Sequence, residues 1–336
     1  MSGLQFCPGS HDRLSQRRGN LLSLGRIGPL WRILIVNLKL KNPAALAALF
    51  VVSAAAQAQM PKVEMAVYVD ANSNVLRRLD LQTGRYFGTI GQGKLESPRD
   101  LCIDNKKGIV YVSDYVGVKK FDVSTGRYLG IFRSTSVYGQ PNDLAIEADG
   151  SVDVLQDDSA TTYRVQRFNP TTGALVIQTA PRLRDFSALK SLTVDAAGNV
   201  EAWITKGTKG YAEKFNPSLG FVTSTLLQHV PRSPVRSRNG GYVYTFDDAY
   251  LHTEIYGGTG SGSESLRNSV NLFNRSAAEG ALGVIYETYP ADNLNIGNFQ
   301  IEAYDTSFGV PTYIGKININ IPADQSLTDM AVYVRF

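Results

Sequence analysis

The chain has 336 residues, with 34 Lys and Arg, 30 Asp and Glu, and a formal net charge of +4. Seven of the basic residues and one of the acidic residues lie before residue 59. Residues 59–336 therefore carry 27 basic residues and 29 acidic ones. The remainder is slightly acidic, which argues against nucleic acid or an anionic membrane as its partner.

The first recognisable element is an apolar run of 13 residues from Ala44 to Ala56, which follows the basic Lys39-Leu40-Lys41. Small residues in Ala56-Gln57-Ala58 occupy both positions that a signal peptidase reads. These features predict a secretory signal peptide with cleavage after Ala58. The run is short for a transmembrane helix, so no stable membrane anchor is expected after cleavage, and an uncleaved anchor is the alternative.

The basic stretch upstream of this run is unusual for a signal peptide. We therefore hypothesise that translation starts later, near Val36 or Leu38, from a non-standard codon, as in bacteria. Residues 1–58 are expected to be an upstream segment plus signal peptide that is removed. Residues 59–336 are expected to form one secreted or periplasmic domain, because roughly 280 residues are ample for a single closed fold.

Three stretches of the chain then repeat at a step of about forty residues. Each has a β-branched run followed by a turn that ends in Thr-Gly, and the copies contain Asp80-Leu81-Gln82-Thr83-Gly84, Asp122-Val123-Ser124-Thr125-Gly126 and Asn169-Pro170-Thr171-Thr172-Gly173. Each copy holds four short apolar runs separated by Gly, Asn and Asp, which is typical of antiparallel strands joined by hairpins. Four strands in a repeat of this length predict an all-β protein, a β-propeller.

Blades beginning near residues 67, 98, 140 and 188 are readable, and Tyr242–Phe246 indicates a fifth. A sixth is assembled from Val270–Phe273, Leu282–Tyr286, Phe299–Tyr304 and Tyr313–Ile317. We expect six four-stranded blades, with five or seven as alternatives. The segment Leu327–Tyr333 matches the first strand of a repeat, which the blade at Val67 lacks, so the C-terminal strand is expected to close the ring.

Acidic residues recur at the start of the first strands, at Asp100, Asp143 and Asp329. In a propeller these positions surround one mouth of the channel. Three carboxylates there, with the amide of Asn142, could bind a hard cation such as Ca²⁺. The alternative, which a residue repeated with the repeat favours, is that each Asp accepts backbone N–H groups of its own loop and fixes the crossing between blades.

A second acidic group follows the second strands, at Asp70, Asp114, Asp157 and Asp158. The same topology places these loops at the same mouth, where Tyr115 is a candidate for ligand contact. Conventional catalytic signatures are absent from the sequence: it has no HExxH, CxxC or Gly-x-Ser-x-Gly motif. Cys102 is the one cysteine after residue 58, and its apolar surroundings predict a buried packing residue.

The repeated pattern Pro-x-Asp-Leu-x-Ile-Asp, Gly-x-Val-Tyr-Val-Ser-Asp and Val-x-Lys-Phe-Asp resembles NHL-repeat propellers over residues 65–220. The resemblance implies a binding scaffold for proteins, peptides or glycans, because most secreted relatives of this kind are such scaffolds. On this basis we expect ligand contacts at the channel mouth from Asp100, Asp114, Tyr115, Asn142, Asp143 and Asp329, with no cofactor and no catalytic residue.

A weaker resemblance suggests an enzyme instead. Gln140-Pro141-Asn142-Asp143 and Glu96-Ser97-Pro98 are similar to metal-ligand segments of the regucalcin/gluconolactonase family. That resemblance implies a metal-dependent lactonase-like hydrolase, with Glu96, Asn142 and Asp143 as ligands of a divalent metal such as Ca²⁺. The two segments lie in adjacent repeats, closer together than in the family, and the family's later Ser-Asn-Gly segment has no match.

Overall fold

The computed structural model divides the chain into two compact units, Met1–Val52 and Ser53–Phe336. The predicted signal peptide and the segment before it lie outside the described residues. The structure describes residues 63–134, 141–159, 161–183, 191–195, 197–206, 209–226, 232–236, 242–246, 250–255, 263–268, 277–280, 284–290, 299–305, 312–321 and 327–335.

In these residues the strands form six sheets, which we call blades 1 to 6 and list from the inner strand outward. Blade 1 comprises β25 (Leu327–Arg335), β1 (Val63–Asp70), β2 (Val75–Asp80) and β3 (Tyr86–Ile90). Blade 2 comprises β4 (Leu101–Asp104), β5 (Ile109–Asp114), β6 (Gly117–Asp122) and β7 (Tyr128–Ser134). Blade 3 comprises β8 (Asp143–Ile146), β9 (Val152–Asp157), β10 (Thr162–Phe168) and β11 (Leu175–Gln178), with the short β12 (Arg182–Leu183) also paired to β10.

Blade 4 comprises β13 (Ser191–Val194), β14 (Val200–Lys206), β15 (Lys209–Phe215) and β16 (Phe221–Leu226). Blade 5 comprises β17 (Arg232–Arg236), β18 (Tyr242–Phe246), β19 (Tyr250–Ile255) and β20 (Ser263–Asn268). Blade 6 comprises β21 (Ala277–Glu279), β22 (Val284–Pro290), β23 (Phe299–Asp305) and β24 (Thr312–Ile321). All pairings within the blades are antiparallel.

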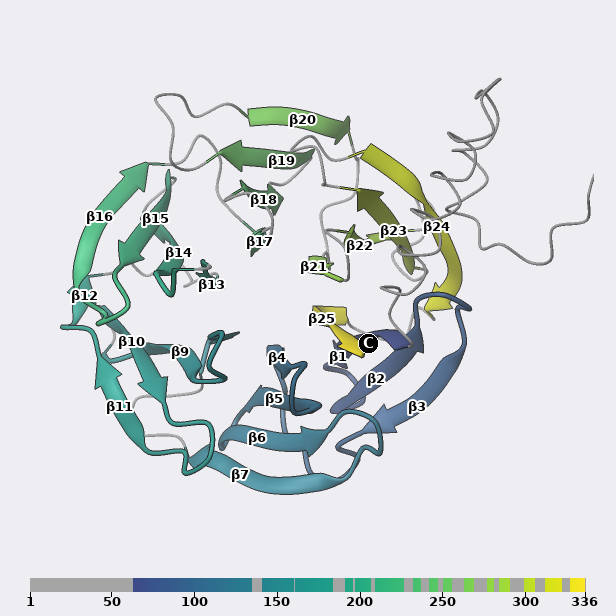
Figure 1. Cartoon of the computed structure of the whole chain (residues 1–336), viewed down its shortest axis with the longest axis horizontal. Helices are drawn as coiled ribbons and strands as arrows, with labels where there is room; N and C mark the ends of the chain where they lie inside the picture. Colours follow the sequence, from purple (N-terminus) through teal and green to yellow (C-terminus); the bar gives the residue numbers. More distant parts are fainter. Residues whose placement is uncertain are drawn as a thin grey trace, which may run out of the picture. The chain divides into compact units, whose positions relative to one another are not determined.

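The inner strands contact one another in a closed cycle around the centre of the second unit (Figure 1). Strand β25 contacts β4, and the contacts continue through β8, β13, β17 and β21 back to β25. The prediction of an all-β β-propeller is therefore confirmed. Two mouths follow from this arrangement: one where the inner strands start and one where they end.

Local sequence explains the strands of blade 2. Val110, Val112 and Phe121 are buried, whereas the turn after β6 is built by Asp122 and Gly126. The Asp122 side chain accepts the backbone N–H of Thr125 at 2.8 Å, and Gly126 adopts a φ of 74°, which glycine reaches without strain. This turn is the Thr-Gly element that the repeat predicted.

Strand β25 closes the ring by pairing with β1, from Val63 opposite Arg335 to Asp70 opposite Leu327. It supplies the inner strand that the first repeat lacks, as predicted. Because both edges of β1 are then paired, no β1 edge is left open to association with another chain. In blade 6 the predicted first strand at Val270–Phe273 lies outside the described residues, and Ala277–Glu279 holds the inner position instead.

The hydrophobic core lies between adjacent blades. Val67 and Leu76 of blade 1 pack with Val110 and Phe121 of blade 2 in one cluster. Further clusters join blades 2 and 3, blades 3 and 4, and blades 6 and 1. Cys102 lies in the cluster between blades 2 and 3. It is buried, as expected, and free, and burial raises the pKa of its thiol. Among the described residues, no helix is long and apolar enough to cross a bilayer.

Candidate functional site

The three repeated aspartates join the inner strands of blades 1, 2 and 3. Asp329 accepts the backbone N–H of Leu101 at 3.2 Å, and Asp100 accepts that of Leu144 at 2.6 Å. Asp143 in turn accepts the backbone N–H of Leu192 in blade 4. Each donor is therefore on the first strand of the following blade.

This arrangement corrects part of the sequence interpretation. Repeated aspartates were expected to accept N–H groups of their own loops, and Asp143 does accept that of Leu144 at 2.9 Å. The main donors nevertheless lie across the seams. The reason is that the inner strands are packed side by side, so the nearest backbone N–H at a strand start belongs to the neighbouring blade. The aspartates thus fix one blade against the next.

The three carboxyl groups also contact one another. Asp100 forms side-chain hydrogen bonds with both Asp143 and Asp329, and it is buried. Burial, together with the charges of these two neighbours, raises the pKa of Asp100 well above its usual range. Burial also raises the pKa of Asp143, although its hydrogen bonds oppose this shift. A hydrogen bond between two carboxyl groups requires a proton, and the raised pKa of Asp100 favours retention of one in this cluster.

The acidic residues after the second strands bind cations on the third strands. Asp70 is 2.7 Å from Arg77, and Asp158 is 2.7 Å from Arg164. These cationic partners were not predicted, although a basic residue follows each acid five to seven positions later in the sequence. Cross-strand pairing across a short hairpin is the signal that could have identified the pairs.

Asp114 has the most enclosed of these ion pairs, and it shapes the loop at Tyr115. Lys119 lies 3.0 Å from its carboxylate, and the exposed fractions of the two side chains are 9% and 0%. The same carboxylate accepts the backbone N–H groups of Glu96 at 2.6 Å and Val116 at 2.9 Å. Tyr115 donates its own N–H to the Glu96 carbonyl at 2.9 Å. The turn is therefore fixed, while the Tyr115 side chain is 62% exposed.

The proposed metal ligands do not form a converged set. Asp143 uses its two carboxylate oxygens to accept the N–H groups of Leu144 and Leu192, and Glu96 has an exposed side chain. Asn142 donates its backbone N–H to Leu155 at 2.8 Å. Within the described ranges, no group of three or more His, Cys, Asp or Glu side chains is placed to hold a metal ion. These residues therefore do not fit a metal site as they are arranged here.

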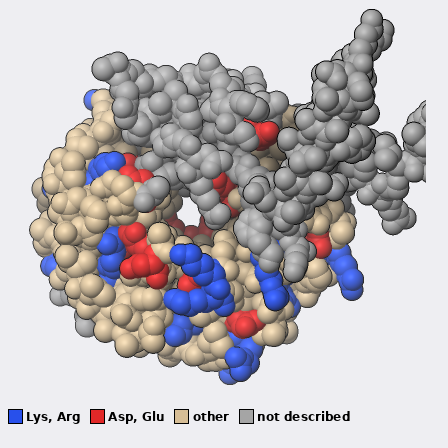
Figure 2. All heavy atoms as spheres, viewed as in Figure 1, with Lys and Arg blue, Asp and Glu red and all other residues tan. Residues whose placement is uncertain are grey.

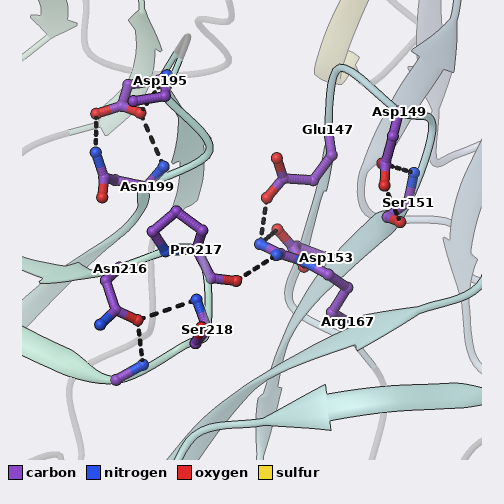
Figure 3. A network of polar contacts seen from close by, with 12 residues as sticks. Glu147, Asp149, Ser151, Asp153, Arg167, Asp195, Asn199, Asn216, Pro217 and Ser218 are labelled. Atoms are coloured by element: carbon purple, nitrogen blue, oxygen red, sulfur yellow. Dashed lines mark hydrogen bonds and ion pairs between the residues drawn. The ribbon is translucent and has the colours of Figure 1, made fainter.

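A second polar network lies at the opposite mouth, where the inner strands end. Arg167 binds Asp153 through two hydrogen bonds of 2.8 and 3.0 Å, forms an ion pair with Glu147, and donates to the carbonyl of Pro217 in blade 4 at 2.7 Å (Figure 3). Burial and the adjacent Asp153 carboxylate raise the pKa of Glu147 to about 8, while Arg167 opposes the shift.

This network was missed from the sequence, although a signal existed. Asp104, Glu147 and Asp195 occupy the same place at the end of three first strands. Figure 2 shows acidic and basic side chains in adjacent groups around a central opening of one face. Like the aspartates of the other mouth, the residues of the network connect neighbouring blades.

No family model matches the chain, and no curated protein matches it either. Solved structures do match. TolB from Acinetobacter baumannii is similar with a TM-score of 0.60 and 11% identity, over 85% of this chain and 72% of that one. A chain of a nidogen/laminin complex is similar with a TM-score of 0.56 and 12% identity, over 80% and 98%. A putative 6-phosphogluconolactonase from Bacteroides uniformis is similar with a TM-score of 0.52 and 15% identity, over 77% and 84%.

The shared property is the β-propeller fold. At these identities the matches establish the architecture alone, because the same scaffold carries many unrelated functions. They agree with the β-propeller fold that both resemblances implied.

Proposed function

We propose that this chain is a secreted or periplasmic, six-bladed, NHL-like propeller that acts as a non-catalytic binding scaffold. Its ligand is a protein, peptide or glycan held at the mouth where the inner strands start. Secretion is inferred from the apolar run that ends before Ala58. No nucleic acid is expected as a partner, because residues 59–336 carry a slight net negative charge.

The observation that carries the proposal is the presentation of Tyr115. Its turn is held by the buried Asp114–Lys119 pair and by hydrogen bonds to Glu96, so little conformational entropy is lost when a ligand binds. Arg99 is exposed on the segment that leads into the same mouth. Tyr and Arg are enriched among the residues that dominate binding energy at protein interfaces.

The carboxylates at this mouth have a supporting role. Asp100, Asp143 and Asp329 accept backbone N–H groups of neighbouring blades, so they hold the rim in position for the ligand. The nidogen/laminin match adds support of a general kind, because that structure is a complex between proteins and this chain covers 98% of the matched chain.

The test is binding to peptide and glycan arrays by the purified full-length chain, with each hit quantified in solution. Tyr115→Ala is expected to weaken binding by tenfold or more, on the order of a hot-spot residue. Tyr86→Ala is the matched control, since Tyr86 is 46% exposed on the outer strand β3. Equal affinity for the wild type, Tyr115→Ala and Arg99→Ala would refute the location of the site.

The second candidate is the metal-dependent lactonase, which the match to a putative 6-phosphogluconolactonase keeps in consideration. It would use Glu96, Asn142 and Asp143, and would require these side chains to rearrange. Lactone hydrolysis that depends on a divalent metal and is lost in Asn142→Ala would favour this candidate over the scaffold.

A further inference from the structure

Arg133 lies in the seam between blades 2 and 3 with its guanidinium group turned toward blade 3. Its Nη2 donates to the side-chain oxygen of Gln156 at 2.5 Å, and its Cζ atom is 4.5 Å from the ring centroid of Phe168. Gln156 is at the end of β9 near the mouth where the inner strands start. The side chain is therefore held in place from blade 3 by one hydrogen bond and one aromatic ring.

The guanidinium group has no acidic partner within the described part of the chain. Its Nη1 atom is buried and makes no hydrogen bond to any described residue, and burial alone lowers the pKa of Arg133 to about 10. The six residues 135–140 that follow β7 contain no Asp or Glu. By contrast, Arg77 and Lys119 at the same mouth each contact a carboxylate. A cation removed from water without a counter-ion is energetically costly, so this position is suited to an anion.

A second unused donor lies on the same rim. The register of blade 3 pairs Asp143 with Leu155, which places the preceding Asn142 beside Gln156, the residue that Arg133 contacts. The Nδ2 atom of Asn142 is buried and also makes no hydrogen bond to the described residues. Both side chains are partly exposed, so the rim of the seam is in contact with solvent although the two donor atoms are shielded.

The chemistry of these groups selects the ligand. One charged and one neutral N–H donor match the two oxygens of a carboxylate. A phosphate carries more charge and more acceptor oxygens than two donors can satisfy. We propose that the seam between blades 2 and 3 binds a carboxylate group through Arg133 Nη1 and Asn142 Nδ2. This inference is independent of the proposed scaffold function, since a small carboxylate suffices as the probe.

The experiment measures the melting temperature of the full-length chain with increasing sodium acetate, with sodium chloride at equal ionic strength as the reference. Acetate at ten times its dissociation constant should raise the melting temperature by about 3 °C. Arg133→Gln should abolish the increase, whereas Arg85→Gln, which removes an equal charge from an exposed turn, should preserve it. An equal increase in Arg133→Gln, or none in the wild type, would overturn the proposal.

Further variants and a second anion test the site and the ligand class separately. Asn142→Asp places a carboxylate beside Arg133, so it should raise the melting temperature without ligand and remove the acetate response. A lower melting temperature with the response intact would count against the site. A larger response to inorganic phosphate than to acetate would overturn the ligand class. Tyr115→Ala should leave the acetate response unchanged, so failure of this site and failure of the scaffold proposal are separate outcomes.

Discussion

The carboxylate of Asp100 accepts the backbone N–H of Leu144 at 2.6 Å, across the seam between blades 2 and 3. Because Asp100 also hydrogen bonds to Asp143 and Asp329, one buried side chain connects the inner strands of three blades. The contact explains why an acidic residue recurs at the start of the first strand.

Replacing Asp100 tests this link. Asp100→Ala leaves the Leu144 N–H buried without an acceptor, and we expect the free energy of unfolding to fall by about 1–3 kcal/mol. Asp100→Asn keeps an acceptor oxygen and adds a donor toward the neighbouring carboxylates, so its loss should be smaller. Urea denaturation at pH 7 measures both. Equal losses in the two variants would contradict the proposed role of the acceptor.

Glu147 should make stability depend on pH. Its pKa in the folded chain is about 8, above the usual value of 4.5, so the folded state holds this proton more tightly than the unfolded state does. The stability it contributes is fully present below the unfolded pKa and is lost as pH rises through the folded pKa. Glu147→Gln cannot lose this contribution. We therefore expect the stability of the variant relative to the wild type to increase as the pH rises from about 5 to about 8.5.

Thermal melts of both chains across that range measure the difference. Comparing the variant with the wild type removes the contribution of groups such as Asp195 and Glu213, whose lowered pKa values act in the opposite direction. A difference in melting temperature that is constant with pH would show that Glu147 does not titrate there.

The buried Asp114–Lys119 pair should be costly to break. Lys119→Met leaves the Asp114 carboxylate without its cation, and the expected loss is about 3–5 kcal/mol. The double variant Asp114→Asn with Lys119→Met should lose less, because no charge then remains buried. Lys107→Met is the control, since Lys107 is 44% exposed beside Asp104 and should cost less than about 1 kcal/mol. Chemical denaturation of the four chains decides between these expectations.

Deleting residues 327–336 should prevent normal folding. The deletion removes β25, which pairs with β1 and contacts both β4 and β21. The β1 edge and the core between blades 6 and 1 would then be exposed, which favours aggregation. We expect the truncated chain to be recovered mainly in aggregates. A soluble chain with a cooperative melt near that of the wild type would contradict this role for β25.

Calcium and EDTA should leave the melting temperature unchanged. Tight binding to the folded state raises stability by mass action, but both carboxylate oxygens of Asp143 already accept N–H groups. The measurement is a thermal melt with each additive, accompanied by metal analysis of the purified chain. A stoichiometric metal together with a clear shift would revive the lactonase candidate.

Much of the fold was predictable because its signals are local. The Thr-Gly turns, the alternation of short apolar runs and the repeat of Asp100-Leu101 as Asp143-Leu144 all lie within one blade's length of chain. Even the closing strand at Leu327–Tyr333 could be identified, since it copies a first strand and the first repeat lacks one. The inner strand of blade 6, Ala277–Glu279, was missed because it is three residues long and lacks the β-branched and aromatic residues that mark other strands.

The sequence alone therefore determined the β-propeller and the acidic residues at one mouth, because each depends on a pattern within a repeat. Only the tertiary structure decided what those residues contact. Asp100 meets a backbone N–H of the next blade, Glu147 meets Asp153 and Arg167, and Arg133 meets no acid among the described residues. Such contacts depend on how two blades pack, and packing brings together groups whose separation along the chain leaves no periodic signal.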